Sequence, residues 1–227
     1  MISTPFPLLR QFSSVLDIRL LTKEDNVSTD ESIGIAAAAT RLCSLWQAHG
    51  GNVEEVTEPS SRELQADALI TNIVDLSLSI RAADCQQILL FDPVHNAIGL
   101  VHAGWKGLQS GVITNTVKHM NKVYGTDPRT IFAAAGPSLC TSCAEFSDPA
   151  REVPELIDFL DGRSIDLRKA ADHELVSLGV PASHIDRTPD CTRCNPEQYW
   201  TYRGGDQESV MNGMCNVMVA TLRVCSI

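Results

Sequence analysis

A cysteine and a histidine flank a short apolar segment, and together they could bind a metal ion or form a nucleophile and its base. Cys85 follows Ala83-Asp84, and His102 begins the run His102-Ala103-Gly104-Trp105-Lys106-Gly107. Thiolate and imidazole are zinc ligands, and the same groups are the nucleophile and general base of cysteine hydrolases. On spacing alone, a core cysteine and a hydrogen-bonded histidine are an equal alternative. The glycines and tryptophan after His102 favour a substrate loop.

The segment between Cys85 and His102 is predicted to be a β-hairpin. Residues 88–91 and 97–101 are apolar and rich in strand formers, and turn formers separate them. A symmetrical pairing places Cys85 opposite His102, with Cβ atoms about 4.5–5.5 Å apart, close enough to share one metal ion. Asp84 would then point to the opposite face of the strand, where it could brace a loop.

Two CxxC pairs form a second candidate site. One pair is Cys140 and Cys143, and the other is Cys191 and Cys194. Four thiolates could bind a structural zinc ion, but these pairs are farther apart than the roughly 15–20 residues that are usual, and no glycine-rich knuckle flanks them. We therefore expect simple packing or redox-sensitive thiols, with structural zinc as the alternative.

Cationic and aromatic residues near loop signals form a third group in an otherwise acidic chain. The group contains Arg203, Tyr202, Lys106 and Arg81. Each of these residues, taken alone, is explained by ordinary surface charge or exposure. The histidines outside the candidate sites are expected to face solvent; they are residues 95, 119, 173 and 184.

The composition predicts one domain, over residues 1–227, that acts on small molecules. The length suits a single large core, and 44% hydrophobic with 20% charged residues is ordinary for a globular protein. A net charge of −10 argues against a nucleic acid or an anionic membrane as partner. Small molecules are the expected partners, and the protein is expected to be a monomer or homodimer.

Cysteine usage is interpreted through the expected compartment. The first residues show no basic leader with an apolar core, and no run reaches the roughly 18 apolar residues of a membrane span. We therefore expect a cytoplasmic protein whose eight cysteines are reduced or bind metal. Cys43 and Cys225 lie in apolar surroundings and are expected to be core residues.

The elements that position these residues mix strands and helices without a regular βαβ order, so we predict an α+β fold with mixed β-sheets flanked by helices. A capping box at Ser28 and Glu31 and the glycines after His49 predict a helix that ends near His49. Period-2 alternation predicts a half-buried strand over 74–80. Further helices are expected over 108–124 and 167–178, strands over 16–21 and 131–135, and a strand or short helix over 210–224.

Seven short motifs follow one another between about residues 45 and 215. They are Gln47-Ala48-His49-Gly50, Ala66-Asp67-Ala68-Leu69-Ile70-Thr71, Ala83-Asp84-Cys85, His102-Ala103-Gly104-Trp105-Lys106-Gly107, Gly136-Pro137-Ser138, Cys191-Thr192 and Tyr202-Arg203. In content and order they resemble the YfiH or laccase-domain family, once labelled multicopper polyphenol oxidoreductases.

The resemblance implies a single domain with a zinc ion bound by His49, Cys85 and His102. Three protein ligands and an open fourth position are typical of a catalytic zinc. The implied activity is purine nucleoside chemistry: phosphorolysis of adenosine, inosine, guanosine or methylthioadenosine, and deamination of adenosine. The expected catalytic residues are Cys85, His102 and Asp84, and the expected substrate- or phosphate-binding residues are Lys106, Arg203 and Trp105.

The sequence departs from the family pattern in several places. Its first 45 residues lack the serine-rich and asparagine-arginine motifs, and Cys140-Thr141-Ser142-Cys143 replaces an adjacent cysteine pair. Arg203-Gly204 replaces a double arginine, and Lys106 stands where arginine is common; lysine offers phosphate a point charge rather than a bidentate fork. Reduced or altered nucleoside activity is the expected consequence.

Three alternatives to the zinc-dependent nucleoside enzyme are open. A metal-free cysteine hydrolase or deamidase would use Cys85 as nucleophile and His102 as base, and would not need His49. A copper-dependent polyphenol oxidase would need more metal ligands than the sequence offers. A zinc-stabilised interaction domain without enzymatic activity would depend on the four CxxC cysteines.

Overall fold

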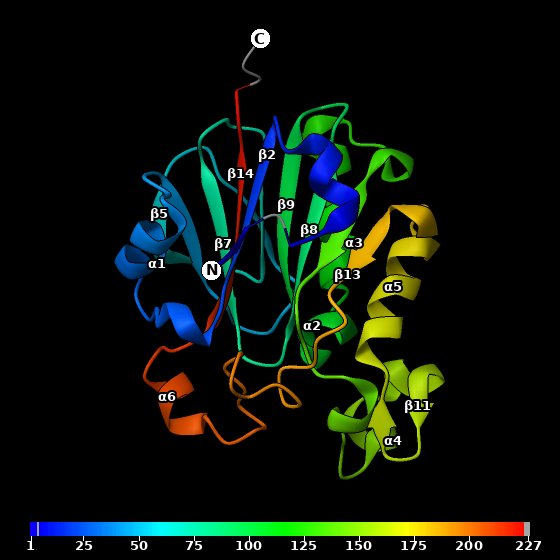
Figure 1. The fold of residues 1–227 in the computed structure, drawn as a ribbon. Helices are drawn as coiled ribbons and strands as arrows, with labels where there is room; N and C mark the ends of the chain where they lie inside the picture. Colours follow the sequence, from blue (N-terminus) through cyan, green and yellow to red (C-terminus); the bar gives the residue numbers. More distant parts are fainter. Residues whose placement is uncertain (4, 225–227) are drawn as a thin grey trace.

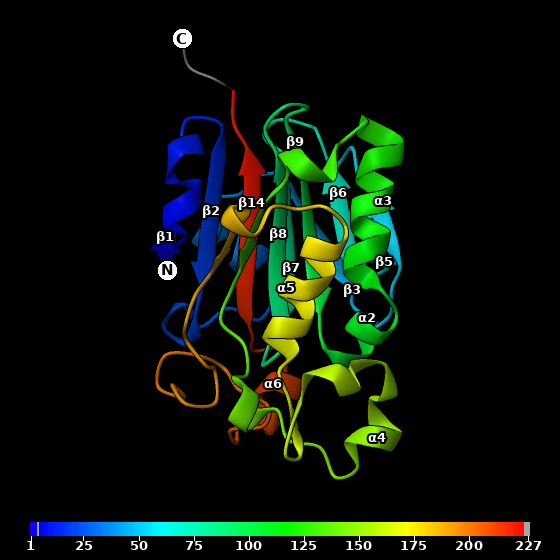
Figure 2. The same ribbon diagram turned by 90° about the vertical axis from the view of Figure 1, so that its right-hand side faces the viewer.

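Two six-stranded sheets form the centre of the protein, and helices lie against their outer faces (Figures 1 and 2). The computed structural model describes residues 1–3 and 5–224, so Cys225 lies outside the described residues. Both sheets contain parallel and antiparallel pairs. The fold class is therefore confirmed as α+β with mixed sheets flanked by helices.

The first sheet joins the two ends of the chain. Its central strand β14 (Asn216–Leu222) pairs with both β2 (Leu16–Leu21) and β7 (Ser77–Ala82), antiparallel to each. The sheet order is β1-β2-β14-β7-β3-β5, and the remaining strands are β1 (Ile2–Ser3), β3 (Leu42–Trp46) and β5 (Ser60–Gln65).

The second sheet contains the predicted hairpin, formed by β8 (Gln86–Asp92) and β9 (Ala97–Ala103). Its order is β13-β10-β8-β9-β6-β4, and the remaining strands are β13 (Ile185–Arg187), β10 (Phe132–Ala135), β6 (Ala68–Thr71) and β4 (Val53–Glu55). A separate two-stranded sheet pairs β11 (Leu160–Asp161) with β12 (Ser164–Ile165).

The three longest helices cover the sheets because each buries apolar side chains. The amphipathic helix α3 (Val112–Tyr124) packs Val117 and Met120 against the second sheet and ends at Gly125 in a left-handed cap, as predicted. A left-handed Gly111 separates it from α2 (Trp105–Gln109), where the sequence predicted one continuous helix. The other α-helices of the described residues are α5 (Leu167–Ser177) on the same side, α1 (Asp30–Ala37) against the first sheet, α4 (Pro149–Glu152) and α6 (Gln207–Met211).

The predicted helix that ends near His49 is wrong over its second half. Helix α1 begins after the cap residue Thr29, which pairs with Ser32, and ends at Ala37, where Ala38 turns left-handed. The chain then enters strand β3, which lies between β5 and β7. Apolar residues at i, i+3 and i+4 suggested a helix. The extended strand instead buries Cys43 and Leu45 between the two sheets, and the free energy gained by that burial outweighs the local preference for a helix.

The hairpin register is also shifted from the predicted one. Gln87, not Cys85, pairs with His102, because Asp92 pairs directly with Ala97 and closes a four-residue turn. The Asp92 carboxylate accepts hydrogen bonds from the backbone N–H groups of that turn. Because the shift is by two residues, the side chains keep their faces, and Cys85 still converges on His102.

Strand β7 is buried on both faces rather than half-buried. Its polar residues Ser77 and Ser79 are 2% and 1% exposed. Their hydroxyls can be buried because they hydrogen-bond to the Thr221 hydroxyl and the Cys43 carbonyl. Cys43 is a buried core residue, as predicted. Of the four histidines expected to face solvent, His95 and His173 are exposed, whereas His119 and His184 are half-buried. His184 stacks on Phe132 with ring centroids 4.0 Å apart.

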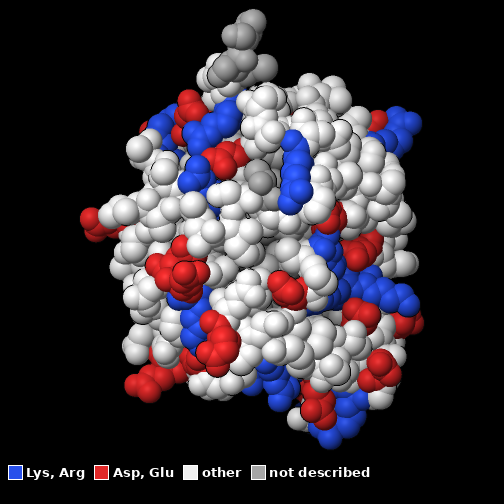
Figure 3. Space-filling view, viewed as in Figure 1, with Lys and Arg blue, Asp and Glu red and all other residues white. Residues whose placement is uncertain are grey.

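The molecular surface carries both signs of charge. Figure 3 shows small acidic and basic groups interspersed over one face, with no continuous basic area on it. None of the helices in the described part of the chain combines the length and apolar character needed to cross a membrane.

Candidate functional site

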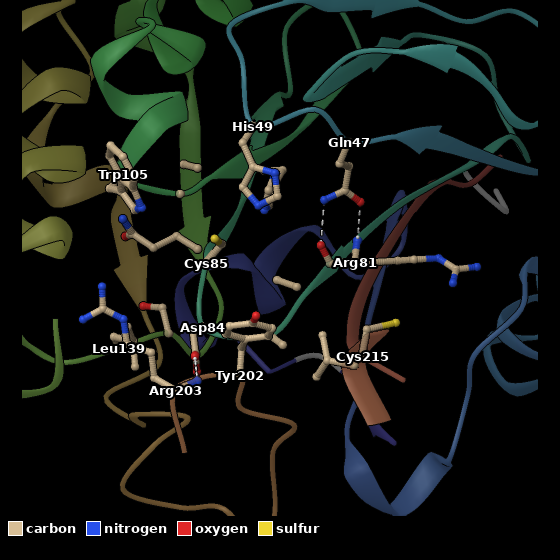
Figure 4. Close-up of a pocket in the computed structure, with 18 of the residues that line it drawn as sticks. Gln47, His49, Arg81, Asp84, Cys85, Trp105, Leu139, Tyr202, Arg203 and Cys215 are labelled. Atoms are coloured by element: carbon tan, nitrogen blue, oxygen red, sulfur yellow. Dashed lines mark hydrogen bonds between the residues drawn. The ribbon is translucent and has the colours of Figure 1, made fainter. Parts of the chain in front are cut away.

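A pocket of about 550 Å³ opens where β7 of the first sheet and β9 of the second sheet end. A volume of this size suits a small organic ligand. Figure 4 shows lining side chains from the loops after β3 and β7, such as His49 and Cys85, together with Tyr202 and Arg203 from a loop near the C-terminus. Its walls include Gln47, His49, Arg62, Arg81, Asp84, Cys85, His102, Trp105, Leu139, Tyr202, Arg203 and Met211.

His49, Cys85 and His102 meet in this pocket, although they come from three separate segments. One ligand atom of each residue lies within 4.8 Å of those of the other two. His49 is exposed in the loop after β3, Cys85 is half-buried just before β8, and His102 is buried on β9. The two imidazole rings are 4.8 Å apart at an angle of 78°. The three residues that the family resemblance indicates as metal ligands are thus brought together.

The buried carboxylate of Asp67 fixes two of these residues. Its Oδ1 lies 2.9 Å from Nδ1 of His102 and accepts the backbone N–H of His49, while Oδ2 accepts the N–H of Gly50. Contact with Nδ1 leaves Nε2 of His102 free to face Cys85 and His49. Carboxylates that hold a ligating histidine in this way set its tautomer and orientation. The hydrogen bonds from the backbone N–H groups to Asp67 also stabilise the left-handed backbone of His49, whose φ is 60°.

The charges of Cys85 and His102 support each other. Burial opposes ionisation of Cys85, but the positive charge of His102 and hydrogen bonds from both histidines lower the pKa of the thiol to about 6. Burial also opposes the charged imidazole, but the thiolate and Asp67 raise the pKa of His102 to about 9. A thiolate is the form that binds metal or attacks a substrate, so the site is prepared for either chemistry.

Gly104 makes room for the thiol. It lies two residues after His102, and a Cβ at this position would be only 2.6 Å from Sγ of Cys85. Real Cβ atoms do not approach so closely, so the thiol would have to move. The glycine of the His102-Ala103-Gly104 run therefore has a steric role in the site.

We expect Gly104→Ala to displace the Cys85 thiol and weaken metal binding by at least about 10-fold. Titration of metal-free protein with zinc would measure the change. Gly50→Ala is the matched control, because its Cβ would lie 3.6 Å from the nearest atom, in ordinary contact. Equal affinities of the two variants would contradict the steric role of Gly104.

Asp84 braces the loops around the pocket instead of reaching the three convergent residues. Its Oδ1 accepts hydrogen bonds from the hydroxyls of Thr192 and Thr201, and its Oδ2 accepts the backbone N–H of Arg203, each at 2.7 Å. Asp84 itself has a left-handed backbone with φ 89°. These contacts hold the loops in place, and the catalytic role of Asp84 stays a prediction.

The expected substrate-binding residues differ in their placement. Trp105 and Arg203 line the pocket, and so does Tyr202 (Figure 4). Lys106 is exposed outside the pocket lining, with its ammonium 5.2 Å from the centre of the Trp105 ring. The role of Lys106 in phosphate binding stays a prediction.

Sequence reasoning missed Asp67 and the pocket residue Arg62. A single carboxylate in an otherwise apolar segment, 66–70, was a signal that a buried partner exists, because buried acidic groups are paired. Nothing near Arg62 in the sequence indicated that it reaches the pocket. Its backbone conformation is left-handed, with φ 55°, and its guanidinium lies over the exposed ring of Trp46.

Similar proteins were found by sequence and by fold. A "Purine nucleoside phosphorylase" of Bacteroides thetaiotaomicron is 29% identical over 148 residues, and an "Adenosine deaminase RL5" of an unknown prokaryotic organism is 32% identical over 148 residues. Each match covers 60% of this chain and only 55% and 56% of the respective relative. The crystal structure of a Bacillus licheniformis "hypothetical protein YfiH" superposes with a TM-score of 0.79 at 22% identity, covering 97% of this chain and 100% of that one.

The family assignment rests on a match along most of the chain. The sequence model of the family described as "Multi-copper polyphenol oxidoreductase laccase" matches residues 16–220. This range includes all seven motifs and every residue of the convergent site. The chain therefore belongs to the multi-copper polyphenol oxidoreductase laccase family, the YfiH or laccase-domain family that its motifs resemble.

Proposed function

We propose that the protein is a zinc-dependent purine nucleoside enzyme. The proposed reactions are phosphorolysis of adenosine, inosine, guanosine or methylthioadenosine, and deamination of adenosine. The observation that carries the proposal is the convergence of His49, Cys85 and His102 in a pocket of about 550 Å³ that also holds arginine and aromatic side chains. The names of the two sequence relatives, a nucleoside phosphorylase and an adenosine deaminase, support it.

The donor set fits zinc. Two imidazole nitrogens and one thiolate are ligands that zinc accepts, and three protein ligands leave a position for water or substrate. His102 offers Nε2 because Asp67 engages Nδ1, and Cys85 offers a thiolate. A zinc ion bound there would act as a Lewis acid and would lower the pKa of a bound water to about 7.

The pocket walls suit the rest of a nucleoside and phosphate. Trp105 and Tyr202 present aromatic rings against which a purine can stack. Of the three arginines that line the pocket, Arg81 forms an ion pair with Asp30 and Arg62 lies over the ring of Trp46. Arg203 donates to the backbone carbonyls of Cys143 and Glu145 and makes no ion pair with a carboxylate of the described residues. We assign phosphate binding to Arg203 and place Asp84 behind it as the residue that fixes its backbone.

A metal-free cysteine hydrolase is the second candidate. The thiolate of Cys85 and the imidazolium of His102 form the charge pair that such an enzyme uses. This alternative gives His49 only the hydrogen bond that helps to lower the pKa of the Cys85 thiol, although Asp67 also holds the backbone of His49. A multi-copper oxidase is less well supported, because the described residues offer only two groups of potential ligands, the three convergent residues and the four CxxC cysteines.

Phosphate dependence tests the proposed reaction. We expect purified protein to release hypoxanthine from inosine only when phosphate is present, with ribose 1-phosphate as the second product. Adenosine should in addition yield inosine without phosphate. Chromatographic assay of the bases and nucleosides measures both reactions. Base release that is independent of phosphate would overturn phosphorolysis, and loss of neither activity on removal of metal would overturn the role of zinc.

A further inference from the structure

The two CxxC pairs, distant in sequence, come together in one four-cysteine cluster: Cys140, Cys143, Cys191 and Cys194. The four sulfur atoms all lie within 4.8 Å of one another. Sγ of Cys194 is 3.6 Å from that of Cys143 and 4.0 Å from that of Cys140. All four residues are free thiols in the structure. The sequence favoured simple packing here, but packing alone does not require four sulfurs around one point.

The spacing of the sulfurs is that of a tetrahedral metal site. Zinc–sulfur bonds are about 2.3 Å long, so four sulfurs around one zinc ion lie about 3.8 Å from each other. The two measured separations lie on either side of this value. A disulfide would need about 2.05 Å between one pair of sulfurs. The arrangement thus suits a single shared ion better than paired bonds.

The loops that carry the two CxxC pairs are fastened together by the backbone and by Arg168. The backbones of Ser138 and Cys191 form an isolated parallel β-bridge, and the guanidinium of Arg168 donates hydrogen bonds to carbonyl groups of both loops. These carbonyls belong to Ser138, Leu139, Pro189 and Asp190. The sulfurs are therefore held at one place by contacts that do not involve them, which makes the cluster preorganised for an ion.

Charge and hydrogen bonds also favour an occupied site. Four thiolates and one divalent ion carry a net charge of −2, which nearby cations and N–H groups can stabilise. The half-buried guanidinium of Arg168 lies among the loop carbonyls, and within the described residues it makes no ion pair with a carboxylate. The backbone N–H of Cys140 lies 3.3 Å from Sγ of Cys191, as a donor to a thiolate would.

We propose that the four-cysteine cluster is a second metal site, a structural tetrathiolate zinc site separate from the three convergent residues of the pocket. Four protein ligands leave no open position, so the site is closed and has no catalytic role. Cys143 and Cys191 are buried and Cys194 is exposed, which leaves one side from which an ion can enter.

The site would fix one wall of the pocket. Arg203, which lines the pocket, donates to the carbonyl of Cys143, and Leu139 next to Cys140 lines it as well. Thr192, next to Cys191, donates to Asp84. An ion that links residues 140–143 to residues 191–194 therefore holds together the two loops on which this wall is built. The inference does not rest on the proposed nucleoside chemistry.

Metal counting in variants separates the two sites. We expect two zinc equivalents in the wild type, one in the double variant Cys140→Ser/Cys194→Ser, one in His49→Ala, and none when the three substitutions are combined. Both cysteines in the double variant have exposed or half-buried side chains, so the core keeps its packing. Cys43→Ser controls for the loss of a thiol outside both clusters, and the folded variant should keep two equivalents.

X-ray absorption at the zinc edge tests the site without disturbing its ligands. In His49→Ala, which keeps only the four-cysteine cluster, we expect four sulfur neighbours at about 2.3 Å and no nitrogen. Unchanged zinc content in Cys140→Ser/Cys194→Ser would overturn the proposal. So would iron in place of zinc, or a zinc-free wild type in which thiol titration under denaturing conditions shows disulfides among the four cysteines. If the pocket binds no metal, the double variant should still lose one equivalent, so the two proposals fail independently.

Discussion

His49→Ala is expected to remove the zinc ion from the pocket and to lower kcat/KM for phosphorolysis by at least about 100-fold. Loss of a residue that only hydrogen-bonds to a metal ligand lowers activity by up to about 100-fold, and loss of the ligand itself should lower it at least as much. His49 is exposed and comes from a loop, so its removal leaves the core intact. The remaining pair, Cys85 and His102, offers two donors, too few for a stable catalytic zinc site. Metal content and base release in the presence of phosphate measure the two effects.

The same substitution decides between the metal-dependent and metal-free mechanisms. A Cys85-His102 dyad would keep its nucleophile and its base in His49→Ala and would lose only the hydrogen bond from His49 to the thiol, so its activity should fall by much less than about 100-fold. His119→Ala is the control, because His119 lies on α3 and does not line the pocket. Full activity of His49→Ala with unchanged metal content would contradict the three-ligand site. Full activity without metal would favour the hydrolase.

Elements with strong periodicity were predicted because local pattern and tertiary packing agree in them. Helix α3 carries an apolar face over three turns, and the segment that forms α5 has a clear stop at Gly179. Strand β3 was misassigned because its apolar spacing is compatible with a helix, and only its neighbours β5 and β7 determine that it is extended. Short apolar segments of this kind cannot be assigned from periodicity alone.

The site was predictable only where its residues are close in sequence. Cys85 and His102 lie on one hairpin, and the error in register preserved their faces because it was an even number of residues. His49 came from the family resemblance, since no local rule brings a loop after β3 to the end of β9. The convergence of the four cysteines depends on contacts between loops about 50 residues apart, which the sequence shows as two separate pairs.

Asp67→Asn is expected to weaken zinc binding in the pocket by about 10–100-fold and to destabilise the metal-free protein by about 2–4 kcal/mol. Asp67 accepts from the ring of His102 and from the backbone N–H groups of His49 and Gly50. An amide keeps one acceptor oxygen but places an N–H group against at least one of these donors. Zinc titration and denaturant unfolding measure the two effects.

The stability effect of Asp67 should depend on pH in a defined direction. Burial acts to raise the pKa of Asp67, but hydrogen bonds from His102, Gly50 and His49 outweigh it and hold this pKa below its usual range. A carboxyl whose pKa is lower in the folded state stabilises the fold above its unfolded pKa, about 3.9, and loses that contribution as pH falls through the folded value. The difference in unfolding free energy between wild type and Asp67→Asn should therefore shrink below about pH 4. It should also shrink as pH rises from about 6.5 through about 9, because His102, whose pKa Asp67 helps to raise to about 9, then loses its charge. A difference that stays the same down to the acid limit of folding would show that the Asp67 carboxylate contributes through its shape alone, and that its charge does not hold His102 and the His49 loop in place.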